Sequence, residues 1–137
     1  MDKTTSCILI DDDPDEHELF TMALKDTLLN ITCAYFSRCS LAIDFYEGEK
    51  NLIPDLIFVD WRLADVEGKD CITNLRMVTQ LQGSKMYIYS GLRNLMEQDY
   101  LDGLKIGFLQ KKDSVALLTG ELKNIMNFES KQIQKHP

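Results

Sequence analysis

The sequence contains no apolar run long enough to cross a membrane, and its first residues have neither the basic nor the apolar region of a signal peptide. These absences predict a cytoplasmic protein. The net charge of −7 argues against a general affinity for nucleic acid or for an anionic membrane surface. Repeats, low-complexity stretches and linkers are also missing. The 137 residues are therefore expected to form one domain with a single sizeable core.

The cysteines lack the spacing of a metal or redox motif, because no Cys-x-x-Cys pair occurs. Only two histidines, His17 and His136, could complete a zinc site. Three of the four cysteines lie in apolar segments, as small buried hydrophobic residues do. The four are Cys7, Cys33, Cys39 and Cys71. We expect all of them to be reduced structural thiols, in keeping with a cytosolic compartment.

One acidic residue stands out because it follows a strongly apolar run. Leu56 to Val59 are four apolar residues in a row, which predicts a strand buried on both faces. Asp60 comes next, and a buried carboxylate is costly without a partner. In an open α/β sheet, ligands bind beyond the carboxyl ends of the strands. Asp60 is therefore a candidate site residue, although an aspartate here could also simply cap a turn.

Predicted strands alternate with predicted helices along the chain. The strands are Ser6–Ile10, Ile31–Phe36, Leu56–Val59, Lys85–Tyr89 and Ile106–Gln110. The helices begin near Pro14, Ser37 (as N-cap), Gly68, Asn94 and Asp113 or Ser114. This alternation predicts one parallel sheet with helices on both faces, formed by residues 1–128. Residues 129–137 are polar and are expected to form a frayed tail.

Polar side chains gather at the predicted carboxyl ends of these strands. Asp11 and Asp12 follow the first strand, Asp60 the third, Ser90 the fourth and Lys111 the fifth. Converging carboxylates repel one another, and Mg²⁺ is the hard cation that prefers such oxygen ligands. A lysine and a serine hydroxyl can both bind phosphate oxygens. The set predicts transfer of a phosphoryl group onto a carboxylate, which gives an aspartyl phosphate.

These residues, together with Gly68, Ser90-Gly91 and Phe108 three residues before Lys111, resemble the receiver domain of the two-component response regulator family. The resemblance covers Cys7 to about Phe128. It implies a flavodoxin-like, doubly wound α/β fold, with a five-stranded parallel sheet in the order 2-1-3-4-5 and five helices.

The resemblance also implies a metal site. Asp12 and Asp60, with the backbone carbonyl of Arg62, would ligate Mg²⁺. Asp11 would hold metal-bound water as part of the same site.

Further roles follow from the same resemblance. Asp60 would be the phosphoacceptor, and Ser90 and Lys111 would hold the phosphoryl oxygens. Phe108 takes the place of the switch aromatic, which moves inward when the serine follows the phosphoryl group. Two further residues are given no functional role: His17 is expected to be an exposed helix residue, and Tyr89 is expected to be a packing residue.

The sequence departs from the family pattern at several positions. The proline usual four residues after the phosphoacceptor is Ala64, and the proline usual after the lysine is Lys112. Arg62 and Leu92 occupy positions that tune autodephosphorylation in the family. Leu92 cannot orient an attacking water, so we predict slow autodephosphorylation.

Together these features predict a single-domain response regulator rather than an enzyme. A sensor histidine kinase or a histidine phosphotransfer protein would phosphorylate Asp60, and the surface of the fourth helix, fifth strand and fifth helix would bind an unknown downstream protein. No nucleic-acid or membrane partner is expected. The missing proline at Lys112 motivates an alternative, a receiver-like interaction module that phosphorylation does not control. A small phosphatase with its nucleophile in Asp11-x-Asp13 is a third hypothesis, but such enzymes normally carry a cap or a longer chain.

Overall fold

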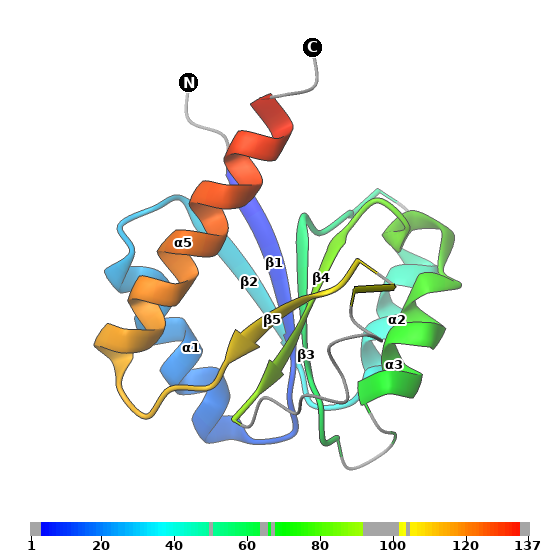
Figure 1. Ribbon diagram of the computed structural model, residues 1–137. Helices are drawn as coiled ribbons and strands as arrows, with labels where there is room; N and C mark the ends of the chain where they lie inside the picture. Colours follow the sequence, from blue (N-terminus) through cyan, green and yellow to red (C-terminus); the bar gives the residue numbers. More distant parts are fainter. Residues whose placement is uncertain are drawn as a thin grey trace.

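The structure, a computed structural model, describes residues 4–49, 51–63, 66, 68–91, 102–103 and 105–134. Within these ranges, five parallel strands form one sheet in the order β2-β1-β3-β4-β5 (Figure 1). The strands are β1 (Thr5–Ile10), β2 (Ile31–Phe36), β3 (Leu56–Asp60), β4 (Lys85–Ser90) and β5 (Gly107–Gln110). The predicted strand order and fold class are therefore confirmed.

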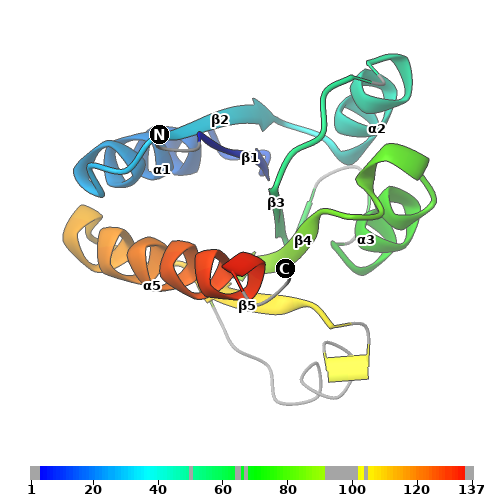
Figure 2. The same cartoon turned by 90° about the horizontal axis from the view of Figure 1, so that it is seen from above.

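Helices cover both faces of the sheet. Figure 2 shows α1 and α5 on one face and α2 and α3 on the other. Their bounds are α1 (Pro14–Asp26), α2 (Cys39–Gly48), α3 (Gly68–Arg76) and α5 (Val115–Gln134), and a short 3₁₀ helix η1 spans Thr79–Leu81. The helix predicted from Asn94 lies outside the described residues. No helix in the described ranges combines the length and hydrophobicity needed to cross a membrane.

The central strands are apolar because both of their faces are covered. All five residues of β3 are buried. Alternate residues point to opposite sides, so Ile57 and Val59 join the cluster under α2 and α3, while Leu56 and Phe58 join the cluster under α1 and α5. This double burial holds the backbone of β3 firmly up to Asp60 at its end.

The helix that follows β1 begins as the sequence predicts. Pro14 occupies the first turn of α1, where its missing N–H costs no hydrogen bond. Asp13 is the N-cap, and its carboxylate accepts a hydrogen bond from the Asp15 backbone N–H at 3.0 Å. The predicted cap of α2 is wrong: Arg38, not Ser37, is the N-cap and makes no side-chain capping hydrogen bond.

The last helix is longer than predicted. We expected a frayed tail after Phe128, but α5 continues to Gln134. The polar residues in this stretch include Glu, Lys and Gln, which are good helix formers. In addition, the Glu129 carboxylate accepts a hydrogen bond from the Tyr87 hydroxyl, which ties this part of α5 to the sheet.

Two of the four cysteines form a disulfide, which the sequence analysis did not anticipate. Cys39 on α2 and Cys71 on α3 are both buried and are joined with their Cα atoms 5.8 Å apart. The expectation of reduced thiols is therefore wrong for this pair, whereas Cys7 and Cys33 are free. The two bonded residues are separated by 32 positions, and only the packing of α2 beside α3 brings them together.

Candidate functional site

The three acids singled out in the sequence meet at the carboxyl end of the sheet. Asp11 follows β1 and Asp60 ends β3, two strands that pair directly. One carboxylate oxygen from each of Asp11, Asp12 and Asp60 lies within 4.8 Å of the others. Asp11 and Asp60 are buried and Asp12 is exposed, so the cluster opens to solvent on one side.

The ammonium group of Lys111 lies against the two buried acids. Lys111 Nζ is 3.1 Å from Asp11 Oδ2 and 3.4 Å from Asp60 Oδ1. Lys111 follows β5 directly, and its backbone N–H donates to the Ser90 carbonyl at 2.8 Å, which fixes the start of its side chain. Burial alone would lower the pKa of Lys111, but the charges of Asp11 and Asp60 outweigh it and raise that pKa.

The surroundings of Asp60 disfavour the ionised form of its carboxyl group. Burial, helped by the charge of Asp11, raises the pKa of Asp60 to about 6, although Lys111 and the Arg62 backbone N–H act in the opposite direction. Carboxylate oxygens of three residues within 4.8 Å of one another are the ligands that a hard divalent cation such as Mg²⁺ prefers. The residues present therefore fit the predicted metal.

Gly68 allows the start of α3 to pack against the backbone of Asp60. A Cβ atom at Gly68 would lie 2.7 Å from the Asp60 carbonyl oxygen and 2.8 Å from the Trp61 Cα. Both distances are shorter than real Cβ contacts, and both neighbours are backbone atoms that cannot easily move. The Gly68 N–H also donates to the Trp61 carbonyl at 3.0 Å. Glycine is thus required here by close packing.

The remaining predicted site residues flank this cluster. Ser90 ends β4 and is half-buried. Phe108 on β5 is half-buried against the apolar cluster under α2 and α3. The side chain of Arg62 is exposed, beside the acids. Ala64 and Leu92 lie outside the described residues, and no peptide bond in the described ranges is cis, including the one between Lys111 and Lys112.

A pair of residues behind the site, Tyr89 and Glu16, was not predicted from the sequence. Tyr89 on β4 pairs with Asp60 in the sheet register, is fully buried, and donates its hydroxyl to Glu16 Oε2 at 2.9 Å. Lys111 Nζ lies 5.2 Å from the centroid of the Tyr89 ring. The sequence alone predicts only a packing role for Tyr89. A phenol directly before Ser90, on a strand that ends at the site, is the signal that could have identified it.

His17 also differs from expectation. It is half-buried rather than exposed, and its Nε2 is hydrogen-bonded to the backbone carbonyl of Asp11. Its ring packs against Tyr35 with centroids 5.1 Å apart. His17 therefore supports the backbone at the first acid.

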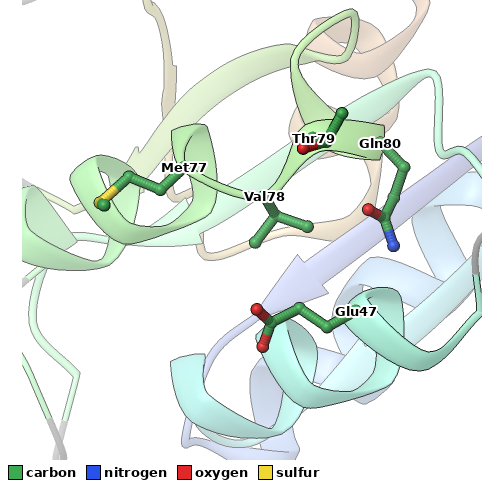
Figure 3. Close-up of a pocket in the computed structure, with 5 residues that line it drawn as sticks. All are labelled: Glu47, Met77, Val78, Thr79 and Gln80. Atoms are coloured by element: carbon green, nitrogen blue, oxygen red, sulfur yellow. The ribbon is translucent and has the colours of Figure 1, made fainter.

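A hollow of about 470 Å³ lies away from the acids. It is formed where α2 ends and where α3 leads into η1, segments that precede β3 and β4, so it lies at the amino ends of the strands. Its lining residues are Glu47, Met77, Val78, Thr79 and Gln80 (Figure 3). None of the predicted site residues belongs to it, and it offers a single carboxylate.

Comparisons with known proteins support the fold. Neither the protein-family models nor the curated protein sequences give a match. Solved structures do. The phosphorylated cyanobacterial phytochrome response regulator RcpA is 17% identical with a TM-score of 0.78, over 92% of this chain and 94% of that one.

Two further structures agree with this result. The Mn²⁺-bound form of response regulator Rcp1 is 17% identical with a TM-score of 0.75, over 90% of this chain and 93% of that one. A CheY-like receiver domain from Methylobacillus flagellatus is 20% identical with a TM-score of 0.71, over 91% and 98%. The chain therefore has the fold of response regulator receiver domains. At these identities the likeness concerns the fold, and the function has to be argued from the site.

Proposed function

We propose that this receiver-fold protein accepts a phosphoryl group on Asp60, with Mg²⁺ bound by the neighbouring acids. One observation carries the proposal: the carboxylates of Asp11, Asp12 and Asp60 converge within 4.8 Å, with the Lys111 ammonium group in contact with two of them. A carboxylate nucleophile, a site for a hard cation and a fixed positive charge are the parts that phosphoryl transfer needs.

The phosphodonor would be a phosphohistidine on a sensor histidine kinase or a histidine phosphotransfer protein. One Asp60 carboxylate oxygen attacks the phosphorus, the new O–P bond forms, and the P–N bond breaks. The electron pair of the broken P–N bond stays on the imidazole nitrogen. Because the pKa of Asp60 is about 6, most of the nucleophile is already ionised at neutral pH, and a bound cation increases that fraction.

The other residues would act around this step. Asp11, Asp12, Asp60 and the backbone carbonyl of Arg62 would hold Mg²⁺, which would neutralise charge on the phosphoryl oxygens. Lys111 is expected to release Asp60 and bind a phosphoryl oxygen, because the attacking carboxylate loses its own charge.

The transferred phosphoryl group would then switch a protein-binding surface. Ser90 would follow a phosphoryl oxygen, and Phe108 would move with it. The surface comprises the fourth helix, which lies outside the described residues, with β5 and α5. β5 is an edge strand, and α5 exposes Leu117 and Phe128. Capture of a partner that increases when the protein carries beryllofluoride supports this switch, and equal capture with and without it counts against it.

Phosphorylation is tested by incubation with acetyl phosphate and Mg²⁺, followed by intact mass measurement. We expect one added phosphoryl group on the wild type and none on Asp60→Asn. The control is Asp44→Asn, an exposed aspartate on α2, which should be phosphorylated normally. A folded wild type that gains no mass would refute the proposal and favour the interaction module without phosphate control.

Decay of the aspartyl phosphate is expected to be slow, because Leu92 offers no group to orient water. The isolated phosphoprotein is followed over time by intact mass. A lifetime of seconds would contradict this expectation.

A further inference from the structure

We propose that Tyr89 and Glu16 act as positioning residues for Lys111, a role that rests on the proposed phosphoryl transfer. The ring of Tyr89 is the surface on which the Lys111 ammonium group lies, and the hydrogen bond to Glu16 holds that ring in place. The pair thereby keeps the ammonium group at Asp60, where the phosphoryl group is received.

The ring of Tyr89 lies at cation–π distance from the lysine. Lys111 Nζ is 5.2 Å from the ring centroid, within the limit of about 6 Å for an attractive contact. Only 22% of the Lys111 side chain is exposed, so solvent screens this attraction weakly. The ammonium group is therefore held by Asp11 and Asp60 and, in addition, by an aromatic face.

The ring itself is fixed by contacts at two points. The hydroxyl donates to Glu16 Oε2 at 2.9 Å, and Phe20 packs edge-to-face against the ring with centroids 5.5 Å apart. Burial, together with the charge of Glu16, raises the pKa of Tyr89, so its hydroxyl remains a donor at neutral pH. A ring anchored in this way cannot tilt away from Lys111 when the lysine changes partners.

The charge of Glu16 adds to this arrangement. Glu16 lies in the first turn of α1, and its charge is among those that raise the pKa of Lys111. Because Tyr89 occupies Glu16 Oε2, that carboxylate is engaged by the phenol. We therefore expect the lysine to exchange between Asp11, Asp60 and a phosphoryl oxygen without leaving the ring.

β4 supplies a matched control. Tyr87 lies two residues before Tyr89 on the same face of the sheet, and its hydroxyl donates to a helix carboxylate in the same way, here Glu129. The Tyr87 ring packs against Phe58, so Tyr87→Phe removes a comparable hydrogen bond on β4 and leaves the Tyr89–Glu16 pair intact. Any general effect of weakening a tyrosine anchor on β4 should appear in this variant too.

The first measurement requires neither phosphate nor metal. In the NMR spectrum of the metal-free wild type, the ring current of Tyr89 should shift the Lys111 ε-methylene protons upfield of the other lysines. The shift should disappear in Tyr89→Leu and persist in Tyr87→Phe. Lys111 protons at the ordinary lysine position in the wild type would overturn the proposal, even if Tyr89→Leu does not fold.

The second measurement is the phosphorylation rate with acetyl phosphate at saturating Mg²⁺. Tyr89→Leu should react about five-fold more slowly, because loss of one partly buried cation–π contact lowers by about that factor the fraction of molecules whose Lys111 ammonium group lies at Asp60. Tyr89→Phe keeps the ring but loses the hydrogen bond to Glu16, so its rate should lie between those of Tyr89→Leu and the wild type, and Mg²⁺ affinity should be unchanged in both variants. A Tyr89→Phe rate equal to that of the wild type would remove Glu16 from the positioning role. An unchanged rate in Tyr89→Leu, or a Tyr89→Phe variant as slow as Tyr89→Leu, would refute the role in transfer. A wild type that is not phosphorylated refutes the proposed function instead, and the NMR result still decides whether Tyr89 places Lys111.

Discussion

Replacing Asp60 by asparagine should stabilise the metal-free protein at neutral pH. Burial and the charge of Asp11 raise the pKa of Asp60 from its ordinary 3.8 to about 6. A difference of this size corresponds to a cost of about 3 kcal/mol for the ionised carboxylate in the folded state. We expect asparagine to recover about 2 kcal/mol of unfolding free energy, because the wild-type surroundings relax in part around the charge.

The gain must depend on pH in a defined way. Since the folded state binds the Asp60 proton more tightly than the unfolded state does, the contribution of Asp60 to stability is fully present below pH 3.8. It is lost as the pH rises to about 6. The difference between Asp60→Asn and wild type should therefore be near zero in acid, grow across this window and remain constant above it.

The assay is urea unfolding of both proteins in the presence of a chelator, at several pH values between about 4 and 7.5. Asp44→Asn, which removes an exposed charge, should show no comparable gain. If the acids hold Mg²⁺ as proposed, adding Mg²⁺ should stabilise the wild type and reduce the advantage of Asp60→Asn, because only the folded carboxylates form the metal site. Equal stabilities at neutral pH, or a difference that does not change with pH, would refute the electrostatic argument.

Three further outcomes follow from the structure. Gly68→Ala should lower the unfolding free energy by about 2 kcal/mol, because its Cβ would meet the backbone at the end of β3. Gly120→Ala on α5, where a Cβ would have nothing within 4 Å, should be neutral or stabilising, and urea unfolding compares the two variants. Reduction of the Cys39–Cys71 disulfide should cost about 4 kcal/mol, as expected for a loop of this length. Thiol titration in denaturant should find two free thiols before reduction and four after it. Asp12→Asn should weaken Mg²⁺ binding roughly ten-fold by calorimetry, and an unchanged affinity would remove Asp12 from the metal site.

The parts of the fold that depend on local patterns could be predicted from the sequence. The apolar run before Asp60 and the alternation of strands with helices are both local, and together they define a parallel sheet with polar groups at one end. Since all five strands are parallel, residues that directly follow them must lie near that same edge. The meeting of Asp11, Asp60 and Lys111 follows from this geometry.

The parts that depend on contacts distant in sequence could not be predicted. Tyr89 and Glu16 are 73 residues apart, and nothing in either segment indicates the other. The pairing of Cys39 with Cys71 likewise requires the relative placement of two helices. The prediction of a frayed tail after Phe128 was wrong for another reason. The polar composition of this stretch suggests loss of structure, but its residues favour a helix, and α5 continues to Gln134.

The disulfide has a topological consequence for the site. The bond between Cys39 and Cys71 closes a covalent ring that contains all of β3, and hence Asp60. Asp11 and Lys111 lie on chain outside that ring. Every interaction between Asp60 and these two residues therefore joins the covalently closed ring to a part of the chain outside it. Folding alone assembles the site across this boundary, so an oxidised but unfolded chain keeps its ring and loses the site.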